Sequence, residues 1–221
     1  MSTEPKTNSF QSLKRKVRYF LNRNYPTVFF TPHMLKDEFN LFKKHTADSK
    51  NIIEYGAGGS TFFFLKNRKN LYTVENNLPF VELLKSMKYF NKMVSLGKIK
   101  FFYVDLGPTA GWGKPVDESN KENWILYASK VWDEIPAGVK IDTIFIDGRC
   151  RVLTGLYSIL KTDKDAKFII HDFWTRKQYH VLLDFLEPIE TASQLIVCKK
   201  KEDIDLKKVE ELIKVYRYEF A

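Results

Sequence analysis

The chain has 221 residues, of which 44% are hydrophobic and 29% charged, a composition typical of one globular domain with a full-sized core. No apolar run approaches the ~20 residues of a membrane span, and the N-terminus lacks the apolar core of a signal peptide. The two cysteines, Cys150 and Cys198, are too few for a disulfide scaffold and lack metal-ligand spacing. We therefore expect reduced thiols in a cytoplasmic protein.

The formal net charge is +9, and much of the excess is clustered at residues 14–23 and 199–201. A basic excess is compatible with nucleic acid, an anionic membrane surface or an anionic substrate. Charge runs are usually solvated faces, so these clusters make no strong case for nucleic acid. Nothing in the sequence indicates the oligomeric state.

We predict an N-terminal helical extension over residues 1–49, followed by a domain at residues 50–221. Residues 1–9 have the composition of a disordered segment, and residues 10–24 have a basic helical pattern with one apolar face. Thr31-Pro32 then suits a helix N-cap followed by proline at the first position, with a helix through Met34 to Lys44.

Residues 51–65, NIIEYGAGGSTFFFL, contain the most informative pattern of the chain. A short apolar strand ends in Glu54, a turn rich in glycine follows, and Ser60-Thr61 opens an apolar helical run. Glycines let the backbone approach a ligand at the carboxyl edge of an open α/β sheet. Glu75 ends the next apolar run, 21 residues after Glu54, where an acid would meet ribose hydroxyls. The pattern predicts a nucleotide site.

Apolar strand patterns and helical patterns alternate from residue 51 onward, which predicts βαβ units and an α/β fold with a parallel sheet. We predict strands at 51–55, 71–75, 99–104, 142–147, 167–171 and 193–198. The predicted helices span 60–67, 78–92, 121–133, 150–161, 175–187 and 206–216. The last strand follows Pro188 too closely for a full crossover helix, so we expect it to pair antiparallel.

The segment Glu54-Tyr55-Gly56-Ala57-Gly58-Gly59-Ser60 resembles the first motif of class I S-adenosylmethionine (SAM)-dependent methyltransferases, with Ser60 in place of the third glycine. The resemblance covers about residues 50 to 200. It implies a Rossmann-like, mostly parallel seven-stranded sheet with helices on both faces, the last strand antiparallel, and SAM as cofactor. It places Glu54 near the methionine end, Glu75 on the ribose and Asp105 on the adenine. The implied cofactor-binding residues are Glu54, Gly56, Gly58, Gly59, Ser60, Thr61, Glu75, Asn76, Asp105 and Leu106.

A long irregular segment, residues 104–124, follows the third strand and holds three glycines and two prolines. Long loops inside compact domains are usually functional or disordered. Because Trp112 near its middle would be costly to leave bare, we interpret the segment as a cofactor or substrate lid, with a merely packed loop as the alternative.

Two further strand ends place candidate catalytic groups, Asp147, His171 and Asp172, at the same edge of the sheet. In one mechanism, His171 or Asp172 removes a proton from an acceptor hydroxyl as the hydroxyl attacks the SAM methyl group. In another, Asp147 and Asp172 hold Mg²⁺ or Mn²⁺, as in the similar catechol-type O-methyltransferases. The third ligand common in that group, an Asn after the second Asp, is Phe173 here.

The same edge carries cationic and aromatic candidates for binding an acceptor. Three arginines could grip a carboxylate, phosphate or sugar acid by bidentate hydrogen bonds, or one of them could pair with Asp147 and be purely structural. Tyr179 could stack on the acceptor or belong to the core. The predicted substrate-binding residues are Trp112, Arg149, Arg151, Arg176 and Tyr179.

The function that this sequence predicts is SAM-dependent methyl transfer to a hydroxyl of a small molecule or glycan, with an anionic acceptor as one option. A non-catalytic SAM-binding protein and a nucleic-acid-associated protein are alternatives. A nicotinamide-dependent oxidoreductase is less favoured, because Thr61 stands where G-x-G-x-x-G has its last glycine.

Overall fold

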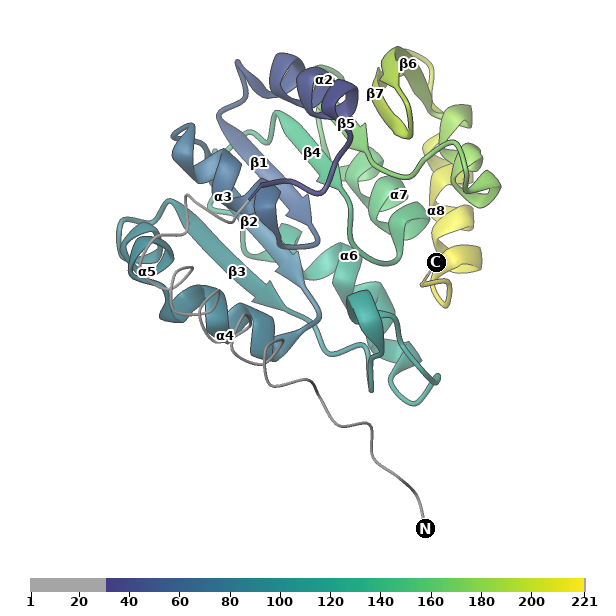
Figure 1. Ribbon diagram of the computed structural model, residues 1–221. Helices are drawn as coiled ribbons and strands as arrows, with labels where there is room; N and C mark the ends of the chain where they lie inside the picture. Colours follow the sequence, from purple (N-terminus) through teal and green to yellow (C-terminus); the bar gives the residue numbers. More distant parts are fainter. Residues whose placement is uncertain (1–30, 221) are drawn as a thin grey trace.

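The computed structural model describes residues 31–220, so the predicted disordered segment and the predicted basic helix over residues 10–24 lie outside the described residues. The chain forms a seven-stranded sheet with the strand order β3-β2-β1-β4-β5-β7-β6 (Figure 1). Strands β1 to β5 are parallel, β7 pairs antiparallel with β5, and β6 pairs antiparallel with β7. The strands are Asn51–Tyr55, Asn70–Glu75, Ile99–Tyr103, Thr143–Ile146, Lys167–Ile170, Leu186–Ala192 and Leu195–Lys200 for β1 to β7.

This sheet confirms the predicted α/β, Rossmann-like class and the antiparallel last strand. Strand β6 was not predicted, because residues 175–187 have a helical pattern. A 3₁₀ helix, η4 (Lys177–Asp184), occupies most of that range, and β6 begins two residues after it. Strand β6 is the sheet edge and is mostly exposed, and Pro188 lies at an irregularity in its pairing. An edge strand of this kind tolerates proline and carries no apolar run, so its sequence signal is weak.

The α-helices flank the sheet on both faces, as predicted. The range 78–92 is divided, because extended backbone at Met87 separates α4 from α5. The described helices are α2 (Lys36–Thr46), α3 (Gly59–Lys66), α4 (Leu78–Ser86), α5 (Lys88–Ser95), α6 (Trp124–Asp133), α7 (Arg151–Lys161) and α8 (Leu206–Tyr216).

Two hydrophobic layers hold the helices against the sheet, because successive strand residues face opposite sides. On one side Ile53 and Ile144 pack with α6, α7 and α8. On the other side Ile52 and Phe145 pack with α2, α3, α4 and α5 (Figure 1). The ring of Phe42 in α2 is fully buried, 5.0 Å from that of Phe145. Helix α2 is therefore part of the same core as the strands.

The strand order reverses its direction of growth between β1 and β4, which is the switch point where open α/β sheets bind ligands. The loops that leave these two strands touch through glycine backbones. A Cβ added to Gly56, whose φ is +96°, would lie 2.7 Å from the Cα of Gly148. Only residues without side chains fit this approach, which brings both strand ends to one crevice.

Among residues 31–220, no helix combines the length and the apolar composition of a membrane span. Cys150 and Cys198 are both free and buried. The cytoplasmic location stays a prediction.

Candidate functional site

A cavity of about 360 Å³ opens at the switch point, and we call it the glycine-loop cavity. Its volume is within the range of small-molecule sites. Six of the ten predicted cofactor residues line it: Gly56, Gly58, Gly59, Ser60, Glu75 and Asn76. The described residues that line the whole cavity are 31–34, 56–60, 75–77, Phe80, Gly113, Tyr127 and 147–149.

Glu54 and Thr61 lie beneath this cavity rather than on its wall. The Glu54 carboxylate accepts hydrogen bonds from the hydroxyls of Ser60, Thr61 and Thr73 and is fully buried. The Thr61 hydroxyl also accepts the N–H of Gly58. Burial raises the pKa of Glu54 to about 8, although the three hydroxyls oppose that shift. In the structure, Glu54 holds the glycine turn against the start of α3.

Glu75 lies on the cavity wall, with its carboxylate fixed by backbone N–H groups. Oε1 accepts from Asn76 and Asn77, and Oε2 accepts from Ala57 at 3.0 Å. Burial raises the pKa of Glu75, while these N–H groups and the charge of Arg149 act in the opposite direction. A carboxylate has about four acceptor positions and three are used here, so Glu75 retains capacity for a ligand hydroxyl.

The leading segment, residues 31–35, crosses directly over the glycine turn. A Cβ added to Gly59 would lie 2.0 Å from the carbonyl oxygen of Thr31 and 2.5 Å from the nitrogen of Pro32. Because no side chain fits there, Gly59 lets the leading segment form one wall of the cavity, with His33 and Met34 also on that wall. The sequence signalled a helix start near these residues but not their place over the turn.

The segment 104–124 contributes to the cavity through Gly113, whose carbonyl accepts a hydrogen bond from the Asn76 side chain at 2.8 Å. Asp105 is exposed and accepts from Gly107 N–H and Asn120 Nδ2, so it folds the segment on itself. Neither Asp105 nor the buried Leu106 is among the described residues that line the cavity. The side chain of Trp112 lies outside what the structure describes.

A second hollow of about 560 Å³ adjoins the first, and we call it the arginine cavity. Three described residues, His33, Asp147 and Arg149, line both cavities and so mark their junction. The others that line the arginine cavity are Gly111, Lys114, Arg151, His171, Asp172, Arg176 and Phe220.

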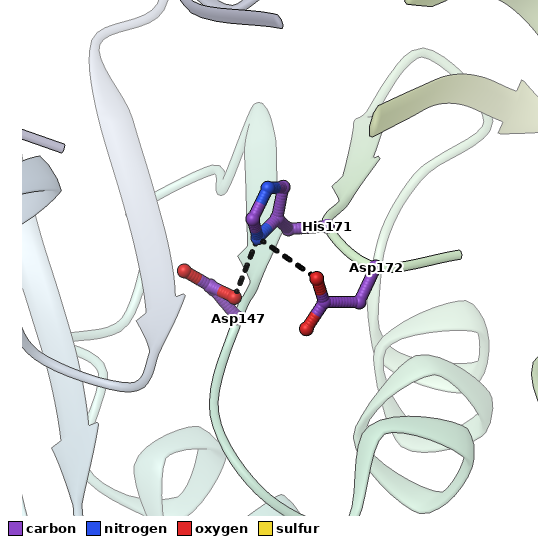
Figure 2. A group of neighbouring side chains, drawn as sticks. All are labelled: Asp147, His171 and Asp172. Atoms are coloured by element: carbon purple, nitrogen blue, oxygen red, sulfur yellow. Dashed lines mark hydrogen bonds and ion pairs between the residues drawn. The ribbon is translucent and has the colours of Figure 1, made fainter. Parts of the chain in front are cut away.

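The predicted catalytic group, Asp147, His171 and Asp172, is brought together as expected (Figure 2). His171 Nδ1 lies 3.1 Å from Asp147 Oδ1 and 3.6 Å from Asp172 Oδ1. The other ring nitrogen, Nε2, lies 3.3 Å from Oε2 of Glu38 in α2. Burial acts to lower the pKa of His171, but the three carboxylates outweigh it and raise the pKa. A raised pKa favours the protonated imidazole, and only the neutral form can accept a proton as a general base.

Glu38 is a residue of this site that the sequence reasoning missed. It is 2% exposed, and its carboxylate also accepts the N–H groups of Leu35 and Gln194. Glu38 thereby connects α2, β5 and the turn between β6 and β7. An acid at the third position of a helix is an ordinary capping pattern, so no sequence signal distinguished Glu38.

Arg151 lies between Asp147 and Asp172, and its side chain is only 4% exposed. Asp172 adopts φ +55°, a strained conformation for a residue with a side chain. Burial acts to raise the pKa of Asp172, but Arg151, His171 and Arg176 together lower it. This geometry corresponds to the alternative in which one arginine pairs with Asp147.

The remaining substrate candidates differ in exposure. Arg149 lines both cavities, and Arg176 lines the arginine cavity with its Nη2 3.5 Å from Asp172 Oδ2. Tyr179 is 1% exposed and packs beneath the guanidinium groups of Arg151 and Arg176, each 5.8 Å from its ring. Tyr179 thus supports the arginines rather than lining either cavity among the described residues.

No protein-family model matches the sequence, and no curated protein matches it. Solved structures do match its fold. A methyltransferase-like protein from Silicibacter pomeroyi has a TM-score of 0.70 at 20% identity over 85% of this chain and 96% of its own. A proposed caffeoyl-CoA O-methyltransferase from Staphylococcus aureus has a TM-score of 0.51 at 13% identity, over 87% and 98%. The S-adenosylhomocysteine-bound Podospora anserina methyltransferase has a TM-score of 0.50 at 10% identity, over 92% and 100%.

The strand order and these similarities show that the chain has the fold of class I SAM-dependent methyltransferases. The identities are too low to carry an acceptor or a reaction from those proteins to this one.

Proposed function

We propose that the protein is a SAM-dependent methyltransferase that transfers a methyl group to a hydroxyl of a small molecule or glycan. The observation that carries the proposal is the pair of adjoining cavities, one lined by the glycine turn and Glu75, the other by Asp147 and several cations. Two adjoining compartments suit a reaction that holds a cofactor and an acceptor in line.

SAM would occupy the glycine-loop cavity. The glycine turn would let backbone approach the cofactor, and Oε2 of Glu75, which accepts one N–H group, would accept a ribose hydroxyl as well. Phe80 offers an apolar wall in the same cavity. SAM supplies an electrophilic methyl group on a sulfonium ion, and every other part of the reaction depends on side chains.

The acceptor would enter the arginine cavity and meet the methyl group at the junction. Its hydroxyl oxygen attacks the methyl carbon, the bond from carbon to sulfur breaks, and S-adenosylhomocysteine leaves. The hydroxyl proton passes to the Asp147 carboxylate, which lines both cavities. His171 and Asp172, the other predicted catalytic residues, would act by holding Asp147 and its neighbours in place.

The charge of the arginine cavity favours an anionic acceptor. Asp147 and Asp172 are already paired with Arg151 and His171. Lys114, Arg149 and Arg176 add positive charge to the same wall. Carboxylates and phosphates are the groups that arginines bind by paired hydrogen bonds.

The first experiment is calorimetric titration of the purified full-length protein with S-adenosylhomocysteine, with NAD⁺ as the control ligand. We expect micromolar binding of S-adenosylhomocysteine and none of NAD⁺. Glu75→Ala should abolish binding, and Glu75→Gln should weaken it less, because an amide oxygen can still accept one hydrogen bond. Absence of binding to the intact, folded protein would refute the proposal.

A further inference from the structure

Charged side chains gather at the carboxyl ends of β4 and β5, and two of them are the carboxylates of Asp147 and Asp172. Asp147, His171 and Asp172 offer three ligand atoms within 4.8 Å of one another, a grouping able to hold a metal ion (Figure 2). The space between the carboxylates is nevertheless filled. The Arg151 atom Nη2 lies 3.2 Å from Asp147 Oδ1 and 3.2 Å from Asp172 Oδ2.

We propose that Arg151 is a built-in cation that takes the place of a divalent metal ion between Asp147 and Asp172, so that methyl transfer in this protein uses no bound metal. The part about methyl transfer rests on the proposed function, whereas the exclusion of metal by Arg151 does not. Arg151 acts as a positioning residue that fixes the Asp147 carboxylate at the junction of the two cavities.

Main-chain oxygens hold the guanidinium of Arg151 in this position. Nε donates to the carbonyl of Gly148 at 3.0 Å, Nη1 donates to the carbonyl of His171, and Nη2 also faces the carbonyl of Asp147 at 3.2 Å. These carbonyls belong to residues just beyond the ends of the neighbouring strands β4 and β5, and Arg151 is the first residue of α7. Because these N–H groups already have acceptors, the guanidinium is held in this position, and its charge is permanent.

The ligand atoms themselves are also occupied. Mg²⁺ and Mn²⁺ prefer oxygen ligands in an octahedral arrangement, with bonds of about 2.0–2.1 Å for Mg²⁺. Asp147 Oδ1 already accepts from both Arg151 and His171, and Asp172 Oδ2 faces both Arg151 and Arg176. A metal ion that used these two oxygens would need to displace Arg151 from both carboxylates, His171 from Asp147 and Arg176 from Asp172. The donor set present is therefore that of an ion-pair network and does not fit a metal.

A neighbouring residue also argues against a metal site. Phe173, which stands where a third oxygen ligand would follow Asp172, is fully buried. Its ring stacks on that of His180, with 5.2 Å between centroids and 26° between planes. The side chain packs into the core and offers no ligand atom.

The test begins with the wild-type protein and MnCl₂, measured by calorimetry and by electron paramagnetic resonance of free Mn²⁺, in the absence and presence of S-adenosylhomocysteine. We expect no Mn²⁺ binding below millimolar concentration, and no change in the melting temperature with MgCl₂ or EDTA. Micromolar Mn²⁺ binding that is lost in Asp172→Asn would overturn the proposal.

The decisive variant is Arg151→Met, which keeps an unbranched apolar stem and removes the charge. We expect this variant to bind Mn²⁺ at least tenfold more tightly than the wild type, and the double variant R151M/D172N to lose that gain. Arg176→Met, which removes a half-buried cation from the same cluster, is the matched control and should gain little. A folded Arg151→Met protein that binds Mn²⁺ no better than the wild type would show that Arg151 does not exclude the metal.

If Arg151→Met does not fold, the wild-type titration decides alone, since tight binding refutes the proposal and its absence supports it. S-adenosylhomocysteine binding to the same wild-type sample separates this result from the proposed function. If the wild-type protein does not bind S-adenosylhomocysteine but the Mn²⁺ results are as expected, the proposed methyltransferase function is refuted. Arg151 then remains the cation between the two carboxylates.

Discussion

The carboxylates in the two halves of the site have different kinds of hydrogen-bond partners. At the ends of β1 and β2, Glu54 and Glu75 are bonded to hydroxyl and N–H groups. At the ends of β4 and β5, Asp147 and Asp172 face guanidinium and imidazole groups. Burial acts on both halves, but the pKa values of the two glutamates are raised and that of Asp172 is lowered.

The difference shows how the partner decides the charge of a buried acid. Neutral donors offset only part of the desolvation cost, so the pKa of Glu54 stays raised, at about 8. Cationic partners outweigh it and keep Asp172 ionised. The half at the ends of β1 and β2 thus surrounds its carboxylates with neutral donors, and the half at the ends of β4 and β5 is an ion-pair network.

The largest expected effect comes from removing the central cation. Arg151→Met leaves two carboxylates facing each other without their buried partner, and we expect it to lower the free energy of unfolding by about 3–5 kcal/mol. Arg176→Met removes a cation whose side chain is 38% exposed and should cost about 0–1 kcal/mol. Urea denaturation of both variants measures the contrast, and equal losses would contradict the distinction between the two arginines.

The second effect is a pH dependence of stability that comes from Glu54. Since the folded pKa of Glu54 is raised from 4.5 to about 8, its contribution to stability is complete below about pH 4.5 and is lost as the pH rises through about 8. Glu54→Gln cannot ionise, so its unfolding free energy should fall less. We expect the difference between variant and wild type to change by on the order of 2–4 kcal/mol between pH 5 and pH 8. Parallel pH curves in urea titrations would refute this.

The third prediction tests the wall that the leading segment forms. A Cβ at Gly59 would collide with the backbone of Thr31 and Pro32, whereas a Cβ at Gly58 meets nothing within 4 Å. We expect Gly59→Ala to displace the leading segment and weaken S-adenosylhomocysteine binding about 10- to 100-fold, which corresponds to about 1.4–2.7 kcal/mol. Calorimetry on the variant and the wild type decides, and equal affinities would argue against the leading segment as a cavity wall.

The smallest effect concerns His171. Its folded pKa is raised, so the stability that its charge adds is present below about pH 6.5 and is lost as the pH rises through the folded pKa. His171→Gln should therefore cost about 1–2 kcal/mol at pH 6 and less at pH 9. NMR titration of the imidazole gives an independent check, because a pKa below 6.5 would contradict the role assigned to the three carboxylates.

Much of the fold was predictable because its signals are local. The glycine turn after β1, the acid at the end of β2 and the alternation of strand and helix patterns depend on residues that are close in sequence. They identified the sheet class, the antiparallel last strand and six residues of the glycine-loop cavity. Strand β6 escaped prediction because an edge strand buries little and so needs no apolar pattern.

The sequence by itself determined that the strand ends of a class I methyltransferase fold would bring Asp147, His171 and Asp172 to one edge. Only the tertiary structure decided which partners each group has there. Glu38 lies next to His171 although the two residues are 133 positions apart in the sequence. Arg151, at the start of α7, donates to the carbonyl of His171 just beyond β5. Desolvation and the charge of such distant neighbours set the pKa values of these groups, and neither quantity is encoded in the spacing of residues along the chain.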